Sequence, residues 1–126
     1  MRSYIIAVDF DGTCVDHCYP DIGLDVPYAV DVLRELVAAG HQLIIWTMRD
    51  GQYLEAAEAW YCHHNIPYLG ANRNPQQDWS TSPKTYAQIY IDDAALGCPL
   101  ASRNGMHRPF VDWAEIRRLL VERGVL

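Results

Sequence analysis

The run from Ile5 to Thr13, Ile-Ile-Ala-Val-Asp-Phe-Asp-Gly-Thr, constrains the fold of this chain more than any other segment. Its first four residues are apolar, as in a parallel strand that is buried on both faces. Asp9 and Asp11 follow, and residues two apart on an extended chain point the same way, about 6–7 Å apart. Two carboxylates at one strand end need a cation or a shared proton, and Gly12 lets the chain turn away sharply. The run therefore predicts a buried strand that delivers two acids to a site.

Length and composition predict one globular domain over residues 1–126. Half of the residues are hydrophobic and 21% are charged, which is ordinary for a soluble protein. The net charge of −6 argues against general nucleic-acid binding, because a binder of that kind needs a basic stripe to neutralise phosphates. We expect no signal peptide and no membrane span. The 4 cysteines form no C-x-x-C pair, so we expect no structural zinc and predict reduced thiols in a cytoplasmic protein.

Apolar periodicity and turn residues predict strands that alternate with helices. A first helix is expected to begin at Pro27, with Asp25 as its cap, and to end at Gly40; a third is expected to begin at Asp112 with a capping box to Glu115. The other predicted elements are strands over 5–8, 42–46, 68–69 and 89–91, a helix over 52–64, a flap over about 14–26, and loops over 70–83 and 94–110.

This alternation predicts an α/β fold of three layers: a Rossmann-like parallel sheet with right-handed crossovers and helices on both faces. In such sheets ligands bind beyond the carboxyl ends of the strands. The polar residues that follow predicted strands are Asp9, Asp11, Thr47, Asp92 and Asp93. Their distribution over several strand ends predicts one shared site at that edge of the sheet.

Four motifs, in chain order, resemble those of the haloacid dehalogenase-like hydrolases, most of which are phosphatases. The run from Asp9 to Thr13 matches the first motif of that family. Thr47 resembles the second motif, Lys84 fits the third, and the apolar strand that ends in Asp92 and Asp93 resembles the fourth. The resemblance extends over about residues 4–93. It implies an Asp-based phosphomonoester hydrolase of the small, capless kind, because the intervals between the motifs are too short for a cap domain.

The resemblance implies a role for each of four catalytic residues. Asp9 would attack phosphorus and form an aspartyl-phosphate, and Asp11 would act as general acid and then as general base. Thr47 would donate its hydroxyl to a phosphoryl oxygen, and Lys84 would supply fixed positive charge.

The resemblance also implies Mg²⁺ as the cofactor. The ligands would be Asp9, the backbone carbonyl of Asp11, and Asp92. Asp93 would either bind the metal directly or orient the other ligands.

Four residues within or next to the first two motifs are expected to bind the substrate: Gly12, Thr13, Met48 and Arg49. Arg49 can reach a substrate anion or pair with an acid, and we favour the substrate. Asp16 and His17 lie in the predicted flap, where exposure to solvent is the simpler interpretation.

Two alternatives differ in class from a phosphatase. A phospho-accepting receiver module also combines acids, a Thr and a Lys around Mg²⁺, but its phosphorylated Asp ends a middle strand, where this chain has Trp46-Thr47. A catalytically weak binding protein of the same fold is the other. The substrate class stays open between a sugar phosphate, a nucleotide and a phosphorylated polymer end. Without a cap the site should be open, and we expect either a homo-oligomer or a macromolecular substrate; no membrane partner is expected.

Overall fold

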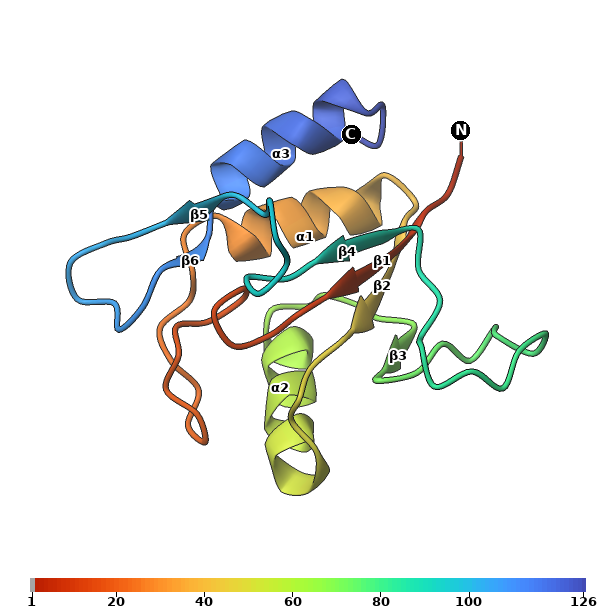
Figure 1. The fold of residues 1–126 in the computed structure, drawn as a ribbon, viewed down its shortest axis with the longest axis horizontal. Coiled ribbons are helices and arrows are strands. Elements are labelled where there is room, and N and C mark those ends of the chain that lie inside the picture. Colours follow the sequence, from red (N-terminus) through yellow and green to blue (C-terminus); the bar gives the residue numbers. More distant parts are fainter. Residues whose placement is uncertain (1) are drawn as a thin grey trace.

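A computed structural model describes residues 2–126 of the chain. Within these residues lie three helices, a four-stranded sheet and a separate two-stranded sheet (Figure 1). In chain order the elements are β1 (Ile5–Val8), α1 (Ala29–Ala38), β2 (Gln42–Ile45), α2 (Gly51–His63), β3 (Gly70–Ala71), β4 (Ile89–Ile91), β5 (Leu100–Ala101), β6 (Phe110–Val111) and α3 (Trp113–Glu122). No helix of this part of the chain has the length and apolar character needed to cross a membrane.

The main sheet has the strand order β3-β2-β1-β4, and every pairing in it is parallel. Ala7 of β1 lies opposite Ile44 of β2 on one side and Tyr90 of β4 on the other. The prediction of a parallel α/β sheet is therefore confirmed. β3 begins at Gly70 rather than at Tyr68. The predicted loop over 94–110 contains β5, which pairs antiparallel with β6 at the end of that loop.

All three helices pack against one face of the sheet. The side chains of Ile6 and Val8 of β1 belong to a buried cluster that includes residues of every helix, such as Leu33, Trp60 and Ile116. Two consecutive right-handed crossovers in the same direction place α1 and α2 on the same face. The Arg34 side chain of α1 accordingly donates to the carbonyl of His64 at the end of α2, at 2.7 and 3.0 Å.

The second face of the sheet has no helix among the described residues, so the prediction of helices on both faces is wrong. Ala7 and Ile44 point to this face and are buried in a small cluster with Ala87. The segment 72–88, which returns the chain from β3 to β4, supplies the cover. Tyr90 holds this segment against the sheet, because the Tyr90 hydroxyl donates to the carbonyl of Thr85 at 2.5 Å. The structure is thus a sheet with one helical layer and one layer of irregular chain.

Side-chain contacts explain the helix starts. Asp25 does not cap α1, because its carboxylate accepts a hydrogen bond from the Trp60 indole at 2.8 Å. The cap position is Tyr28, which adopts a left-handed conformation with φ 67°. Asp112 does cap α3, accepting from the backbone N–H of Glu115 at 3.1 Å as the capping-box pattern predicts.

The predicted flap over 14–26 is a hairpin-like excursion beside the end of β1. The backbone N–H of Asp16 donates to Leu24 and that of Val26 donates to Cys14, at 2.8 and 2.9 Å. Tyr19 and Leu24 are exposed on the flap. Its base is buried, and this places Asp16 and His17 next to the strand ends.

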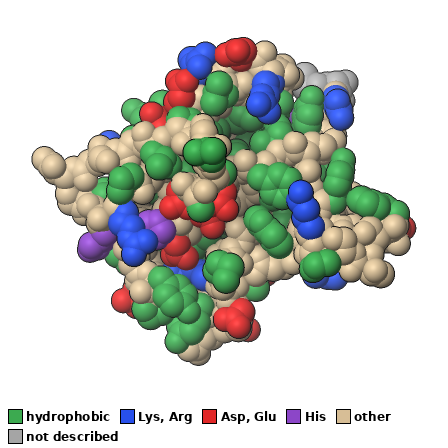
Figure 2. All heavy atoms as spheres, viewed as in Figure 1, with side chains coloured by type: hydrophobic (Ala, Val, Ile, Leu, Met, Phe, Trp, Pro, Cys, Tyr) green, Lys and Arg blue, Asp and Glu red, His purple; other side chains and the backbone are tan. Residues whose placement is uncertain are grey.

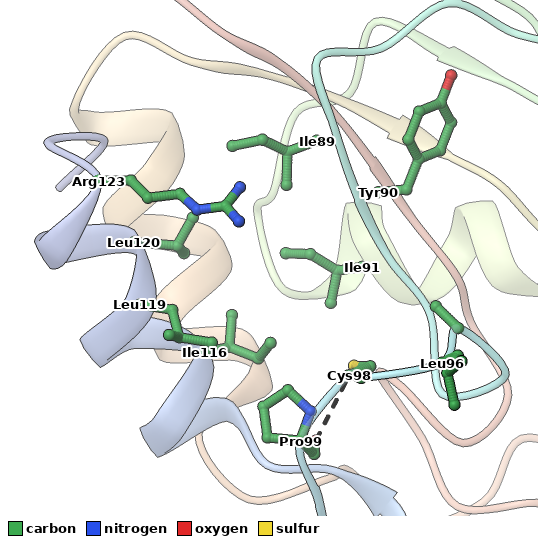
Figure 3. A pocket seen from close by; sticks show the side chains of 12 residues that line it. Ile89, Tyr90, Ile91, Leu96, Cys98, Pro99, Ile116, Leu119, Leu120 and Arg123 are labelled. Atoms are coloured by element: carbon green, nitrogen blue, oxygen red, sulfur yellow. Dashed lines mark hydrogen bonds between the residues drawn. The ribbon is translucent and has the colours of Figure 1, made fainter.

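The outer side of β4 faces an apolar pocket that α3 closes (Figure 3). Ile89 and Ile91 point into it from the strand, and Ile116, Leu119 and Leu120 line it from the helix. No carboxylate lines this pocket. The polar site described next lies beyond the carboxyl ends of the strands.

Candidate active site

Three carboxylates from two neighbouring strand ends form the centre of the site. Val8 and Ile91 pair in register, so Asp9 leaves β1 beside the point where Asp92 and Asp93 leave β4. The backbone N–H of Asp9 donates to the carbonyl of Ile91 at 2.9 Å, which fixes this alignment. One carboxylate oxygen from each acid lies within 4.8 Å of the other two. On the face drawn in Figure 2, acidic side chains gather in the middle, with hydrophobic side chains near them and with His and Lys or Arg side chains to the left and below.

The pKa values of these acids show that burial and mutual repulsion disfavour their ionised forms when no cation is bound. Burial, followed by the contact with Asp93 and the charge of Asp92, raises the pKa of Asp9 to about 8. Burial is also the largest cause of the raised pKa of Asp92. A bound divalent cation would reverse both effects, because its charge favours the ionised carboxylates. Carboxylate oxygens are ligands that Mg²⁺ prefers, so this set of three acids fits the expected cofactor.

Thr13 and Gly12 shape the turn after Asp9. The buried Thr13 hydroxyl donates to Oδ2 of Asp9 at 2.8 Å and so orients the proposed nucleophile. Gly12 has φ 82°, and a Cβ on it would collide with the His17 ring and the Asp93 carboxylate. The sequence predicted that both residues bind substrate. In the structure Gly12 lets His17 and Asp93 come close and Thr13 orients Asp9, and their contact with substrate stays a prediction.

Asp11 points away from the three-carboxylate cluster and pairs with Arg49. Nε of Arg49 donates to Oδ2 at 2.7 Å and Nη2 donates to Oδ1 at 2.8 Å. The Asp11 carboxylate is therefore not in the group that could hold a metal ion. It lines a shallow depression together with Arg49, Tyr19 and Met48.

Arg49 has no donor left for a substrate anion, which corrects the role predicted for it. Its side chain is 1% exposed. Besides Asp11, its guanidinium donates to the carbonyls of Pro20, Asp21 and Tyr53 at 2.8–3.3 Å. These contacts use all five N–H donors of the group. Arg49 joins the flap, α2 and Asp11 into one unit.

Thr47 lies at the end of β2, where the motif places it. Its hydroxyl oxygen accepts from the backbone N–H of Arg49 at 3.1 Å, and its own N–H donates to the Asn72 side chain at 2.8 Å. Within residues 2–126 no hydrogen bond uses the Thr47 hydroxyl as a donor. The sequence analysis missed Asn72, which has φ 55° and also donates to the Arg49 carbonyl. The neighbouring Met48 is 98% exposed, as a residue at the mouth of an open site would be.

Lys84 is another predicted catalytic residue that the structure leaves outside the three-carboxylate cluster. It is exposed on the segment 72–88, and its Nζ lies 5.6 Å from the centre of the Tyr90 ring. Among the described residues no hydrogen bond or ion pair joins the Lys84 amine to an acid. Tyr90 is two residues before Asp92, so Lys84 lies near β4 but not at the carboxylates.

His17 belongs to the site, although the sequence analysis assigned it to a solvated flap. Its Nε2 lies 2.9 Å from Oδ2 of Asp93, and its side chain is 23% exposed. Sequence gives no signal for this contact, because the two residues are 76 positions apart. His17 places a titratable nitrogen at the edge of the carboxylate cluster.

Comparison with known proteins gives one clear relationship. No family model and no curated protein matches the chain. A solved structure of a conserved protein from Bacteroides thetaiotaomicron is similar, with 34% sequence identity and a TM-score of 0.78. The match covers 97% of this chain and 93% of that one. The chain therefore belongs to the same family as this conserved Bacteroides thetaiotaomicron protein.

Proposed function

We propose that the protein is a Mg²⁺-dependent phosphomonoester hydrolase of the haloacid dehalogenase-like type, without a cap domain. The observation that carries the proposal is the meeting of Asp9, Asp92 and Asp93 at two adjacent parallel strand ends. Thr47 comes two residues after the end of β2, the strand on the other side of β1. A nucleophile, a cation site and a hydroxyl donor on three neighbouring elements are what phosphoryl transfer requires.

Asp9 is the nucleophile in this proposal. One of its carboxylate oxygens attacks phosphorus, the bond from phosphorus to the ester oxygen breaks, and the leaving oxygen takes a proton. Water then attacks the acyl-phosphate, which releases inorganic phosphate and restores the carboxylate. The hydrogen bond from Thr13 holds Asp9 in one orientation through both steps. Thr47 donates its hydroxyl to a phosphoryl oxygen.

Asp11 is the proposed acid and base, and its pairing with Arg49 fixes its orientation in both halves of that role. Each of its oxygens accepts one hydrogen bond from Arg49. Each oxygen keeps a second lone pair, so the carboxyl group can carry a proton without losing Arg49. In this proposal Asp11 gives that proton to the leaving oxygen and then takes one from the attacking water.

Asp9 and Asp92 would hold Mg²⁺, together with the Asp11 carbonyl that the resemblance implies and with Asp93 as a ligand or an orienting group. When bound, the ion supplies positive charge to the phosphoryl oxygens and offsets the repulsion among the acids. Lys84 is the proposed second source of positive charge. It acts there only if its amine leaves the Tyr90 ring when an anion binds.

The direct test is hydrolysis of p-nitrophenyl phosphate by purified protein. We expect activity with Mg²⁺, loss of activity in EDTA and recovery when Mg²⁺ is returned. Asp9→Asn should be inactive under all three conditions. Full turnover in EDTA would refute the metal assignment, and no turnover of any phosphomonoester with Mg²⁺ would favour a binding protein or a receiver-like module.

A further inference from the structure

A second group of metal-binding side chains lies where the flap meets the loop before β6. It consists of Asp16, Cys18 and His107. Nδ1 of His107 lies 3.3 Å from Sγ of Cys18 and 2.8 Å from Oδ2 of Asp16. The three donor atoms all lie within 4.8 Å of one another. The group shares no residue with the carboxylate cluster of Asp9.

The geometry argues against a Cys–His–Asp nucleophile. In such a triad the nucleophile and the acid bind opposite nitrogens of the imidazole, so that a proton can pass through the ring. Here Cys18 and Asp16 both contact the same nitrogen, Nδ1 of His107. Three donors that converge from one side are arranged to surround a point, as ligands surround an ion.

We infer that Asp16, Cys18 and His107 form a binding site for Zn²⁺ or a similar borderline-soft divalent ion. Thiolate, imidazole and carboxylate are the ligands that zinc takes in proteins, and three of them leave a fourth position for water. Mg²⁺ does not select such a set, because it prefers oxygen ligands. The site and the carboxylate cluster are therefore expected to hold different metals.

The Asp16 carboxylate is already fixed in the way that metal ligands are. It is 1% exposed. Its Oδ1 accepts from the backbone N–H of His17 at 2.9 Å, and its Oδ2 accepts from that of His107 at 2.8 Å. Outer hydrogen bonds of this kind orient a ligand before the metal arrives. The Cys18 and His107 side chains are more exposed, which gives an ion a path from solvent.

A bound ion would link two segments that are otherwise distant along the chain. Cys18 and His107 are 89 positions apart, which explains why cysteine spacing alone predicted no zinc. The link would also hold His17, which follows Asp16 directly, against Asp93. The ion thus fixes the flap beside the proposed active site without taking part in the reaction.

The test uses Co²⁺ as a spectroscopic substitute for Zn²⁺. Metal-free protein is titrated with Co²⁺ under reducing conditions, with excess Mg²⁺ present to occupy the carboxylate cluster. We expect one equivalent to produce a thiolate-to-cobalt charge-transfer band in the near ultraviolet, and Zn²⁺ to abolish the band by displacement. Cys18→Ser should lose the band, and His107→Gln should weaken cobalt binding by at least about 10-fold.

The matched control is Cys62→Ser, because Cys62 is an exposed thiol on α2 followed by two histidines. This variant should retain the full band. Three outcomes would overturn the inference: no band in the parent protein, a band that survives Cys18→Ser, or a band that Cys62→Ser removes. His107 is exposed, so its variant should fold normally, and circular dichroism of each variant confirms that a lost band reflects a lost ligand.

Discussion

Arg49 holds both carboxylate oxygens of Asp11, with Nε to Oδ2 at 2.7 Å and Nη2 to Oδ1 at 2.8 Å. The pair connects the first and second motifs of the chain, which lie on neighbouring strands. It also connects them to the flap, because the same guanidinium donates to the carbonyls of Pro20 and Asp21. Stability and catalysis should therefore respond together when this pair is changed.

Arg49→Met should destabilise the protein by about 3–5 kcal/mol, because it leaves a partly buried carboxylate and several carbonyls without partners. Urea unfolding in the presence of Mg²⁺ measures the effect. Arg117→Met is the control, since Arg117 forms a solvent-exposed ion pair with Glu35 and should change stability far less. A loss below about 1 kcal/mol for Arg49→Met would contradict the anchoring role.

The same pair predicts how rate depends on the leaving group. Values of kcat/KM for a series of substituted phenyl phosphates and an alkyl phosphate should fall as the leaving oxygen becomes more basic. The reason is that a more basic leaving oxygen depends more on the proton that Asp11 delivers, and Arg49 holds Asp11 in one orientation for that step. Values of kcat/KM that do not depend on leaving-group basicity, in a series where the chemical step limits turnover, would contradict this prediction.

Gly12→Ala should disrupt both the fold and the site. The new methyl group would meet a backbone at φ 82° as well as the His17 ring and the Asp93 carboxylate. Gly105→Ala is the matched control, because Gly105 has φ 91° but no atom within 4 Å of the added Cβ. We expect Gly105→Ala to cost about 1 kcal/mol from backbone strain alone, and Gly12→Ala to cost clearly more and to abolish activity. Equal costs in thermal unfolding would contradict the close approach at Gly12.

The crowded carboxylates predict a pH dependence of stability in metal-free protein. The pKa of Asp9 is about 8 in the folded protein against 3.8 as its ordinary value, so the folded state holds a proton that the unfolded state releases. The stability that this proton on Asp9 adds to the folded state is fully present below about pH 4 and is lost as the pH rises toward 8. Between pH 6 and pH 8 the melting temperature should therefore fall, and Mg²⁺ should raise it more at pH 8 than at pH 6.

Asp9→Asn is the variant that isolates this effect. It removes the titrating group, so its metal-free melting temperature should change less over the same pH range and should exceed that of the parent at pH 8. A gain of about 1 kcal/mol corresponds to roughly 3–6 °C for a domain of this size. A parent protein whose metal-free stability rises steadily from pH 6 to pH 8 would contradict the raised pKa of Asp9.

Sequence predicted the parts of this structure that depend on local pattern. The apolar runs placed β1 and β4 correctly, and Asp9, Asp92 and Asp93 meet as the parallel arrangement predicts. Asp11 was expected beside Asp9 but pairs with Arg49. Asp112 and Glu115 gave the start of α3 for the same reason, since a capping box is a local motif.

The errors arise from contacts between distant segments. The sequence predicts a loop over 70–83, and irregular chain without a helix does cover the second face of the sheet, with Ala87 in the buried cluster there. The general rule that helices cover both faces of a parallel sheet fails here for that reason. No short-range pattern relates Arg49 to Asp11 or His17 to Asp93, which are 38 and 76 positions apart. Asp25 looked like a helix cap because its partner, the Trp60 indole, becomes its neighbour only after α2 packs.

The central claim is that Asp9 becomes phosphorylated during turnover, and a phosphoenzyme trap on Asp11→Asn tests it most directly. Without the Asp11 base, attack on a good leaving group should continue while hydrolysis of the acyl-phosphate slows by about 10²–10⁴-fold. Rapid quenching with labelled substrate should then yield an acid-stable, hydroxylamine-sensitive label, and mass spectrometry should locate it on Asp9. Asp9→Asn should carry none. Label on Asp92, label on Asp9→Asn, or equally slow turnover of both variants without any label would contradict the account.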